Sequence, residues 1–329
     1  MKVLLVTGGA GFIGSNFVKY FLRRNKNFIV VNIDKLTYAG NMNSLREIEE
    51  SPRHHFIKGD ICNYELVNYV MKKYRPDCII NFAAESHVDR SIDRPSIFAE
   101  TNVMGTLTLL EGARYIWSKR NFIGTRFIQI STDEVYGSIN NDKDYFLEES
   151  NLLPNSPYSA SKASADMFVR SYVKTYGLPA MITRCCNNYG PYQNIEKLLP
   201  KCITNALEDR SIPLYGDGTN VREWIHVLDH CIAIIRVLFY GKPGEIYNIG
   251  SGEEMSNLNL VRNILKIMGK PEELIKMVDD RPGHDKRYAL NSYKIRNNLN
   301  WSNKYSLDDG LKETIEWYKS NKEWWKDKS

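Results

Sequence analysis

The chain has 329 residues, 43% of them hydrophobic and 25% charged, with a formal net charge of +5, which is typical of a globular protein. Its 44 basic and 39 acidic residues form no basic stripe, and no stretch has the ~18 uninterrupted apolar residues of a membrane-spanning helix, so we expect neither a nucleic-acid nor a membrane partner. The six cysteines show no Cys-x-x-Cys spacing, which predicts reduced thiols in a cytoplasmic protein and no metal site.

Strand-like and helix-like segments alternate through the first half of the chain. Short apolar runs predict strands at 3–6, 28–31, 78–80, 127–130 and 180–183, and longer stretches between them predict helices at about 14–24, 64–74, 98–117 and 158–176. Continuous runs of this kind suit parallel strands that are covered on both faces. The alternation therefore predicts an α/β fold with a doubly wound parallel sheet of the Rossmann type.

The regular alternation of strand-like and helix-like segments changes after about residue 186. Segments 187–191, 215–219 and 280–284 are rich in Gly, Pro, Asn and Asp, which predicts loops. We expect a smaller, interleaved C-terminal substrate-binding domain at 187–220 and 251–329, because a chain of this length is near the limit of one compact core. The larger domain would span 1–186, with 221–250 returning to it. The lysine-rich end, 324–329, would be frayed.

A glycine-rich turn, Gly8-Gly9-Ala10-Gly11-Phe12-Ile13-Gly14, joins the first predicted strand to the first predicted helix. Its glycines would allow a tight turn and close approach of a pyrophosphate to the backbone, and the helix N-terminus would add N–H groups and a positive dipole end. Asp34 follows at the end of the second predicted strand. A carboxylate there would bind both ribose hydroxyls and repel a 2′-phosphate, which favours NAD over NADP.

Tyr158 and Lys162 lie four residues apart, which places both on one face of the predicted helix 158–176. A lysine ammonium beside a phenol stabilises the phenolate, so the tyrosine could exchange a proton with an alcohol near neutral pH. An isolated pair of this kind would more often be a surface feature. Beside a dinucleotide-binding turn, it indicates catalysis.

Two consecutive carboxylates, Asp133 and Glu134, follow the predicted strand 127–130. Ligands bind at the carboxyl ends of the strands in such sheets, and a pair of acids is costly to remove from water there. A solvated loop is the alternative interpretation. The position of the pair at the sheet's ligand edge favours a catalytic role.

Longer motifs carry a family resemblance. The Thr7-Gly8-x-x-Gly11-x-x-Gly14 turn with Tyr158-x-x-x-Lys162 resembles the extended short-chain dehydrogenase/reductases. Further signatures, spread over nearly the whole chain, resemble those of the dTDP-glucose 4,6-dehydratases: DKLTYAGN at 34–41, AAESHVD at 83–89, STDEVYG at 131–137, NNYGP at 187–191 and RPGHD at 281–285. Glu223 and His226 are departures, since this family more often has Asp and Tyr at these places.

The resemblance implies conversion of dTDP-glucose to dTDP-4-keto-6-deoxyglucose and water. C4 would be oxidised by hydride transfer to NAD⁺ while Tyr158 takes the hydroxyl proton, which makes C5 acidic. Glu134 would then remove the C5 proton, protonated Asp133 would donate to the departing C6 hydroxyl, and the hydride would return to C6. Thr132 would hydrogen-bond the sugar, and Lys162 would hold Tyr158 and the nicotinamide ribose.

The resemblance also implies two sets of binding residues and a homodimer. Those expected to bind NAD are Gly8, Gly11, Phe12, Ile13, Gly14, Asp34, Lys35, Leu36, Thr37, Tyr38, Gly40, Asp60, Ile61, Ala83, Ala84, Ser86, Thr101, Tyr158, Lys162 and Asn188. Those expected to bind the nucleotide sugar are Ser86, His87, Thr132, Asn187, Lys197, Leu198, Pro213, Tyr215, Arg222, Asn257, Arg281 and His284. Arg222 and Arg281 suit a diphosphate because a guanidinium can bind it through two hydrogen bonds. Segments 98–117 and 158–176 would form a four-helix dimer interface.

Several alternatives share some of these features. A nucleotide-sugar 4-epimerase would have the same turn and Tyr–Lys pair but needs no second acid–base pair, so Asp133 and Glu134 argue against it. A GDP-mannose 4,6-dehydratase would use NADP, which Asp34 disfavours, and a non-catalytic NAD-sensing protein would be expected to lack one of the intact pairs. Action on another nucleotide-glucose stays open, because thymine and uracil differ by one methyl group, worth only ~1–3 kcal/mol.

Overall fold

The structure is a computed structural model that describes residues 1–139, 141 and 143–326. Within these residues the largest sheet has seven parallel strands in the order β10-β6-β5-β4-β1-β2-β3. They are β1 (Lys2–Thr7), β2 (Phe28–Asp34), β3 (His54–Lys58), β4 (Cys78–Asn81), β5 (Arg126–Thr132), β6 (Ala180–Cys185) and β10 (Ile246–Ile249). The strand order reverses at β1 and β4, which opens a crevice at their carboxyl ends. The predicted doubly wound, Rossmann-type fold is confirmed.

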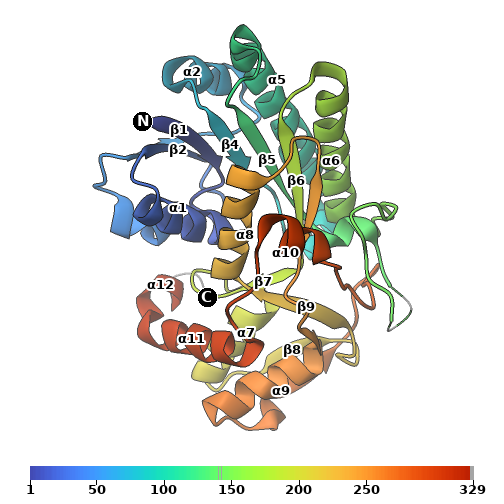
Figure 1. Ribbon diagram of the computed structural model, residues 1–329. Helices are drawn as coiled ribbons and strands as arrows, with labels where there is room; N and C mark the ends of the chain where they lie inside the picture. The colour runs from blue at the N-terminus through green and yellow to red at the C-terminus, as the bar shows by residue number, and fades with distance from the viewer. Residues whose placement is uncertain (140, 142, 327–329) are drawn as a thin grey trace.

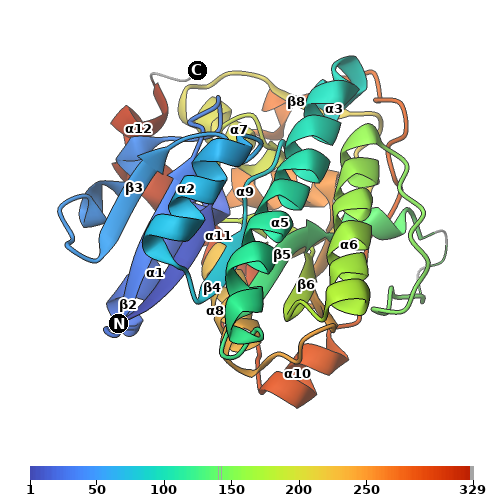
Figure 2. The same ribbon diagram turned by 90° about the horizontal axis from the view of Figure 1, so that it is seen from above.

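Helices cover both faces of this sheet. One face packs against α1 (Phe12–Arg24) and α8 (Val227–Tyr240), and the other against α2 (Tyr64–Tyr74), α5 (Gly105–Trp117) and α6 (Pro157–Tyr176). Figure 2 shows α2, α5 and α6 side by side. Alternate side chains of a strand point to opposite faces, so Leu4 packs with α1 side chains and Leu5 with those of α2 and α5. Burial on both faces explains the continuous apolar runs.

The helical backbone from 95 to 117 differs from the predicted helix 98–117. It begins at α4 (Pro95–Phe98), with proline in the first turn, and continues through a π-helical turn, η2 (Ala99–Met104), into α5. A short helix, α3 (Val88–Asp93), comes before it. Such π-helical turns occur frequently at functional sites. Here the turn carries Thr101 and Asn102 toward the carboxyl end of β4.

A smaller lobe has an apolar core of its own, in which Leu199, Leu260 and Leu311 are completely or almost completely buried. It lies at the bottom of Figure 1, below the large sheet. Its helices are α7 (Leu198–Leu207), α9 (Asn257–Met268), α11 (Leu307–Ser320) and α12 (Lys322–Lys326). Its strands are β7 (Asn187–Tyr189), β9 (Val221–His226) and β11 (Glu254–Ser256) in one sheet, and β8 (Ile212–Tyr215) and β12 (Ile275–Val278) in another. The remaining elements are η1 (Met42–Ile48), η3 (Ser118–Arg120), η4 (Asp133–Tyr136), η5 (Glu272–Leu274) and α10 (Tyr293–Leu299).

Two expectations for the smaller lobe need correction. Residues 187–189, predicted as part of a loop, form β7, because their backbone pairs in parallel with β9. Within 221–250, α8 and β10 pack on or join the large sheet as expected, but β9 pairs with β7 and β11 in the small sheet. The division of the chain into two domains stays a prediction.

The end of the chain is more ordered than its lysine-rich composition suggested. Residues 322–326 form α12, and Trp325 is 1% exposed, with its Nε1 donating to the carbonyl oxygen of Tyr318 at 2.9 Å. The prediction of a frayed end is therefore wrong for 324–326, because an indole buried against α11 fixes this last turn. The rest of that prediction, 327–329, lies outside the described residues.

All six cysteines are free thiols, five of them buried and Cys62 half-buried. Burial raises the pKa of Cys62 and of Cys185 to about 12, so both are protonated at neutral pH. None of the helices in the described ranges is both long enough and apolar enough to cross a bilayer.

Candidate active site

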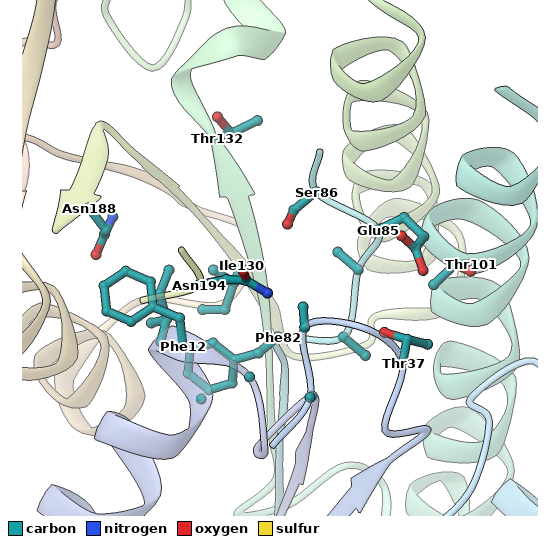
Figure 3. A pocket seen from close by; sticks show the side chains of 18 of the residues that line it. Phe12, Thr37, Phe82, Glu85, Ser86, Thr101, Ile130, Thr132, Asn188 and Asn194 are labelled. Atoms are coloured by element: carbon teal, nitrogen blue, oxygen red, sulfur yellow. The ribbon is translucent and has the colours of Figure 1, made fainter. Parts of the chain in front are cut away.

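A cavity of about 310 Å³ opens at the carboxyl ends of the large sheet's central strands, and residues of both lobes line it. In Figure 3, Phe12 stands at the start of α1, Thr132 at the end of β5, and Asn188 on β7. The crevice where the strand order reverses is the usual ligand site of such sheets. The fold therefore places this cavity where a dinucleotide would bind.

The cavity brings together most of the predicted site residues. All five predicted catalytic residues line it: Thr132, Asp133, Glu134, Tyr158 and Lys162. The predicted binding residues that line it are Gly8, Gly11, Phe12, Ile13, Gly14, Asp34, Lys35, Thr37, Gly40, Asp60, Ile61, Ala83, Ala84, Ser86, Thr101, Asn187, Asn188 and Lys197. Ten others lie outside its lining: Leu36, Tyr38, His87, Leu198, Pro213, Tyr215, Arg222, Asn257, Arg281 and His284. The individual roles of all these residues stay predictions.

The glycine turn leaves helix α1 without a side-chain cap at the cavity wall. Gly11 is the N-cap, and the first turn carries no acidic residue. A Cβ on Gly8 would lie 2.6 Å from the backbone nitrogen of Ala83, and one on Gly14 would lie 2.3 Å from the carbonyl oxygen of Gly8, so packing alone requires both glycines. A Cβ on Gly11 would meet only that oxygen, at 3.2 Å. An uncapped helix N-terminus beside a cavity fits a pyrophosphate.

Asp34 ends β2 at the wall of the same cavity. Its Oδ2 accepts the N–H of Ala10 and its Oδ1 that of Leu36, both at 2.8 Å. Burial raises the pKa of Asp34, and these backbone hydrogen bonds lower it in part. Each carboxylate oxygen can accept more than one hydrogen bond, so Asp34 is held in place and can still accept two ribose hydroxyls.

Tyr158 and Lys162 are both buried on α6 beside the end of β5. The Nζ of Lys162 donates to the carbonyl oxygen of Ile130 at 2.7 Å, and burial lowers the pKa of Lys162. We expected the lysine to lower the pKa of Tyr158. Instead, burial and the charge of Glu134 raise that pKa well above its usual value, and a hydrogen bond with Thr132 opposes them only in part.

Asp133 and Glu134 follow β5 directly and differ in their surroundings. Oδ1 of buried Asp133 accepts the hydroxyl of Thr132 at 3.1 Å, whereas Oδ2 has no partner among the described residues. Burial, together with the charges of Glu134 and Glu223, raises the pKa of Asp133 well above its usual value. Burial also raises the pKa of Glu134, and the charges of Arg281 and other cations offset this rise only in part. These surroundings therefore favour the protonated form more strongly for Asp133 than for Glu134.

Three cations of the smaller lobe, Arg281, Arg222 and Lys197, each lower the pKa of Glu134 through their charge. Lys197 donates from Nζ to the carbonyl oxygen of Ser86 at 2.8 Å. Arg222 is buried and donates from Nη2 to the carbonyl oxygen of Asp285 at 2.9 Å. The positive charge gathered here suits an anionic ligand that reaches from the cavity toward the smaller lobe.

Several buried polar atoms of predicted catalytic and substrate-binding residues lack a hydrogen-bond partner. In the described part of the chain they include Asp133 Oδ2, His87 Nδ1, Asn257 Oδ1 and Arg281 Nε. An unpaired buried polar atom costs ~1–3 kcal/mol, so its presence in a folded protein calls for an explanation. A polar ligand that fills the space between the lobes would supply the missing partners.

Some lining residues were not singled out from the sequence. Glu85 lies inside the motif at 83–89, between the predicted site residues Ala84 and Ser86, so its position in the sequence could have indicated that it lines the site. Asn194 donates from Nδ2 to the carbonyl oxygen of Tyr38 at 3.4 Å and accepts the N–H of Glu196 at 3.2 Å. No sequence pattern pointed to that contact between the lobes. The other unpredicted lining residues are Ile33, Ala39, Gly59, Phe82, Ile130, Ser131, Cys185, Cys186, Gln193 and Glu196.

Comparisons with known proteins agree with this geometry. The family model described as GDP-mannose 4,6 dehydratase matches residues 5–314. A dTDP-glucose 4,6-dehydratase of Neisseria meningitidis is 47% identical over 99% of this chain and 95% of its own length. The crystal structure of the Bacillus anthracis dTDP-glucose 4,6-dehydratase in complex with NAD is 49% identical, with a TM-score of 0.91 over 100% of both chains. That of the Streptomyces venezuelae enzyme with NAD and a TDP ligand is 48% identical, with a TM-score of 0.94 over 99% of this chain and 100% of the other.

Proposed function

Because this chain belongs to the dTDP-glucose 4,6-dehydratase family of extended short-chain dehydrogenase/reductases, we propose that it converts dTDP-glucose to dTDP-4-keto-6-deoxyglucose and water, with NAD as its cofactor. One observation carries the proposal: Asp133 and Glu134 line the same cavity as Tyr158 and Lys162. A 4-epimerase would need Tyr158 and Lys162 but not the two acids, and an NAD-sensing protein would need neither pair.

The cofactor would lie along the carboxyl edge of the large sheet. Gly11 and the N-terminus of α1 would bind the pyrophosphate, and Asp34 would accept the hydroxyls of the adenosine ribose. Bound NAD⁺ would accept the hydride from C4 of the glucose and return it to C6, and the positive charge of its ring would favour the phenolate of Tyr158. Lys162, held by Ile130, would contact the nicotinamide ribose.

Three of the catalytic side chains then carry out the proton transfers. Tyr158 takes the proton of the C4 hydroxyl, and Thr132 orients that hydroxyl. The C4 ketone makes the C5 hydrogen acidic, and ionised Glu134 removes it. Asp133 is kept protonated by its buried surroundings and donates to the departing C6 hydroxyl, so C5 and C6 become joined by a double bond and water leaves. The double bond is then reduced by the hydride at C6 and a proton at C5, which completes the methyl group.

The nucleotide part of the substrate would lie against the smaller lobe. Arg281, Arg222 and Lys197 carry the positive charge that a diphosphate needs. The ring of Tyr215 is 40% exposed and lies edge-on to His284, with their centroids 6.3 Å apart. An exposed aromatic ring at this place suits contact with a nucleotide base. We propose that this base is thymine, because the relatives named above are dTDP-glucose 4,6-dehydratases.

We also propose a cytoplasmic location, where the six thiols would stay reduced.

We further propose a homodimer that forms through α5, α6 and the π-helical turn before α5. Large apolar side chains are exposed on the outer faces of these helices. They include Met104 (53% exposed), Tyr115 (49%), Met167 (44%) and Phe168 (37%). Burying such side chains against a second copy is favourable, and two helices from each copy would make a four-helix interface.

Product analysis with two substrates tests the proposed function. The purified protein is incubated with dTDP-glucose and, separately, with UDP-glucose, and the products are followed by mass spectrometry and by proton NMR of C6. We expect dTDP-glucose to lose the mass of one water and to gain a methyl group at C6. Conversion to a product of unchanged mass would instead indicate a 4-epimerase. Faster turnover of UDP-glucose would overturn the assignment of thymine.

A further inference from the structure

The segment 86–90, which follows β4, links the two lobes through several polar contacts. Lys197 donates to the carbonyl oxygen of Ser86, and Arg90 pairs with Glu196 at 3.3 Å. One residue of this segment, Asp89, makes two further contacts with the smaller lobe. It therefore connects the large lobe to the side chains that would hold the nucleotide.

Both carboxylate oxygens of Asp89 accept a hydrogen bond from a residue that we expect to bind the nucleotide. Oδ1 accepts from Nη1 of Arg281 at 3.1 Å, and Oδ2 accepts from the hydroxyl of Tyr215 at 3.1 Å. Burial alone would raise the pKa of Asp89, but the charge and hydrogen bond of Arg281 outweigh it and hold the pKa below its usual value. Asp89 is thus a charged anchor at neutral pH.

The contact with Asp89 leaves the functional edge of Arg281 available. A guanidinium binds a phosphate best through two parallel N–H groups, and Nε with Nη2 forms such an edge. Asp89 occupies Nη1, outside this edge, while the buried Nε has no partner among the described residues. The carboxylate therefore fixes the plane of the guanidinium without competing for its phosphate-binding edge.

We propose that Asp89 is a positioning residue for nucleotide binding: it holds Arg281 and Tyr215 oriented for the diphosphate and the base before the substrate arrives. Orienting a long arginine side chain in advance removes an ordering cost that binding would otherwise have to meet. Asp89 does not touch the reacting atoms, so its effect falls on binding. The inference rests on the proposed function, because it takes a nucleoside diphosphate as the ligand.

Binding of dTDP and of thymidine to the full-length protein, measured by calorimetry, tests the assignment. Asp89→Asn keeps the size of the side chain and removes its charge. We expect it to weaken dTDP binding about tenfold, as for the loss of one charge-assisted hydrogen bond. Thymidine binding should change less than about twofold, because the amide oxygen of asparagine can still accept the hydroxyl of Tyr215. In turnover of dTDP-glucose, KM should rise about tenfold and kcat should change less than about twofold. Asp93→Asn, on the same helix α3, is the matched control and should leave dTDP binding unchanged.

A double-mutant cycle with Arg281→Gln separates positioning from a general loss of structure. Once Arg281 is replaced, Asp89→Asn should weaken dTDP binding no further. Unchanged or tighter dTDP binding by Asp89→Asn, or equal losses for dTDP and thymidine, would overturn the assignment while leaving the proposed function intact. If wild-type protein bound neither dTDP nor thymidine, both the proposed function and the role of Asp89 would be wrong.

Discussion

The ammonium of Lys162 donates a hydrogen bond to the carbonyl oxygen of Ile130, 2.7 Å away. This contact ties α6 to the end of β5, so the helix that carries Tyr158 and the strand that leads to Asp133 are fixed relative to each other. The catalytic pair and the acid pair therefore share one rigid frame, which is what precise proton transfers require.

Replacing Lys162 with methionine should remove activity and keep the fold. We expect turnover to fall about 10²–10⁴-fold, the range for losing a group that assists proton transfer. The free energy of unfolding should change by no more than ~1–3 kcal/mol, because the carbonyl of Ile130 loses a hydrogen bond, which is destabilising, while loss of a buried ammonium is stabilising. Steady-state kinetics and thermal unfolding measure the two effects. Lys174→Met, at an exposed site of α6, serves as control, and full activity in Lys162→Met would contradict the assignment.

Glu134→Gln should stop the reaction after the first oxidation. The variant retains Tyr158 and Lys162 but lacks the base for C5, so we expect the C4 ketone of glucose to accumulate with the reduced cofactor and little water to be lost. With the wild type, deuterium placed at C4 should appear at C6, and solvent hydrogen should appear at C5. Rapid-quench mass spectrometry and NMR follow both. If the Glu134→Gln variant carried out dehydration at the full rate, Glu134 would be excluded as the base for C5.

Asp133→Asn should make the protein more stable, increasingly so as the pH rises. Burial raises the pKa of Asp133 in the folded state, so above the ordinary aspartate pKa of about 3.9 the unfolded chain loses this proton before the folded one does. Ionisation then favours unfolding until the pH passes the raised pKa. Asparagine does not ionise, so the variant does not lose stability in this way as the pH rises. Thermal unfolding should give equal stability at pH 3 and a higher Tm for the variant at pH 8, and a lower Tm at pH 8 would contradict the raised pKa.

Asp34→Ala should weaken NAD binding. The substitution removes the carboxylate expected to accept the ribose hydroxyls, and hydrogen bonds to a charged group are worth ~1.5–3 kcal/mol. It also leaves the N–H groups of Ala10 and Leu36 without their present acceptor. Calorimetry with NAD and with NADP checks the prediction. If the wild-type protein bound NADP more tightly than NAD, our interpretation of Asp34 would be wrong.

Phe168→Asp should convert a homodimer to a monomer. The substitution places a charge on the face of α6 that would enter the proposed four-helix interface, where an unpaired buried charge is unfavourable. Light scattering at micromolar concentration would detect the change in mass. Tyr293→Asp is the control, because Tyr293 is 72% exposed on α10, which packs against α8 and β10. A monomeric wild-type protein would rule out the dimer.

The fold class and the main chemistry follow from local features of the sequence. Apolar runs buried on both faces predicted the parallel sheet, and the helix at 64–74 was predicted with its observed ends. The glycine turn with Asp34, and the four-residue spacing of Tyr158 and Lys162, predicted two parts of the cavity wall. These features are contained within short segments, where periodicity and spacing alone set which side chains share a face.

The tertiary structure decided the properties that depend on distant residues. Asp89 and Arg281 are 192 positions apart, the strand at 187–189 exists because β9 lies beside it, and Trp325 is ordered by its burial against α11. The raised pKa of Tyr158, opposite to our expectation, arises from burial and from the charge of Glu134. Burial and charge are sums over everything that packs around a group, so no single stretch of sequence contains them.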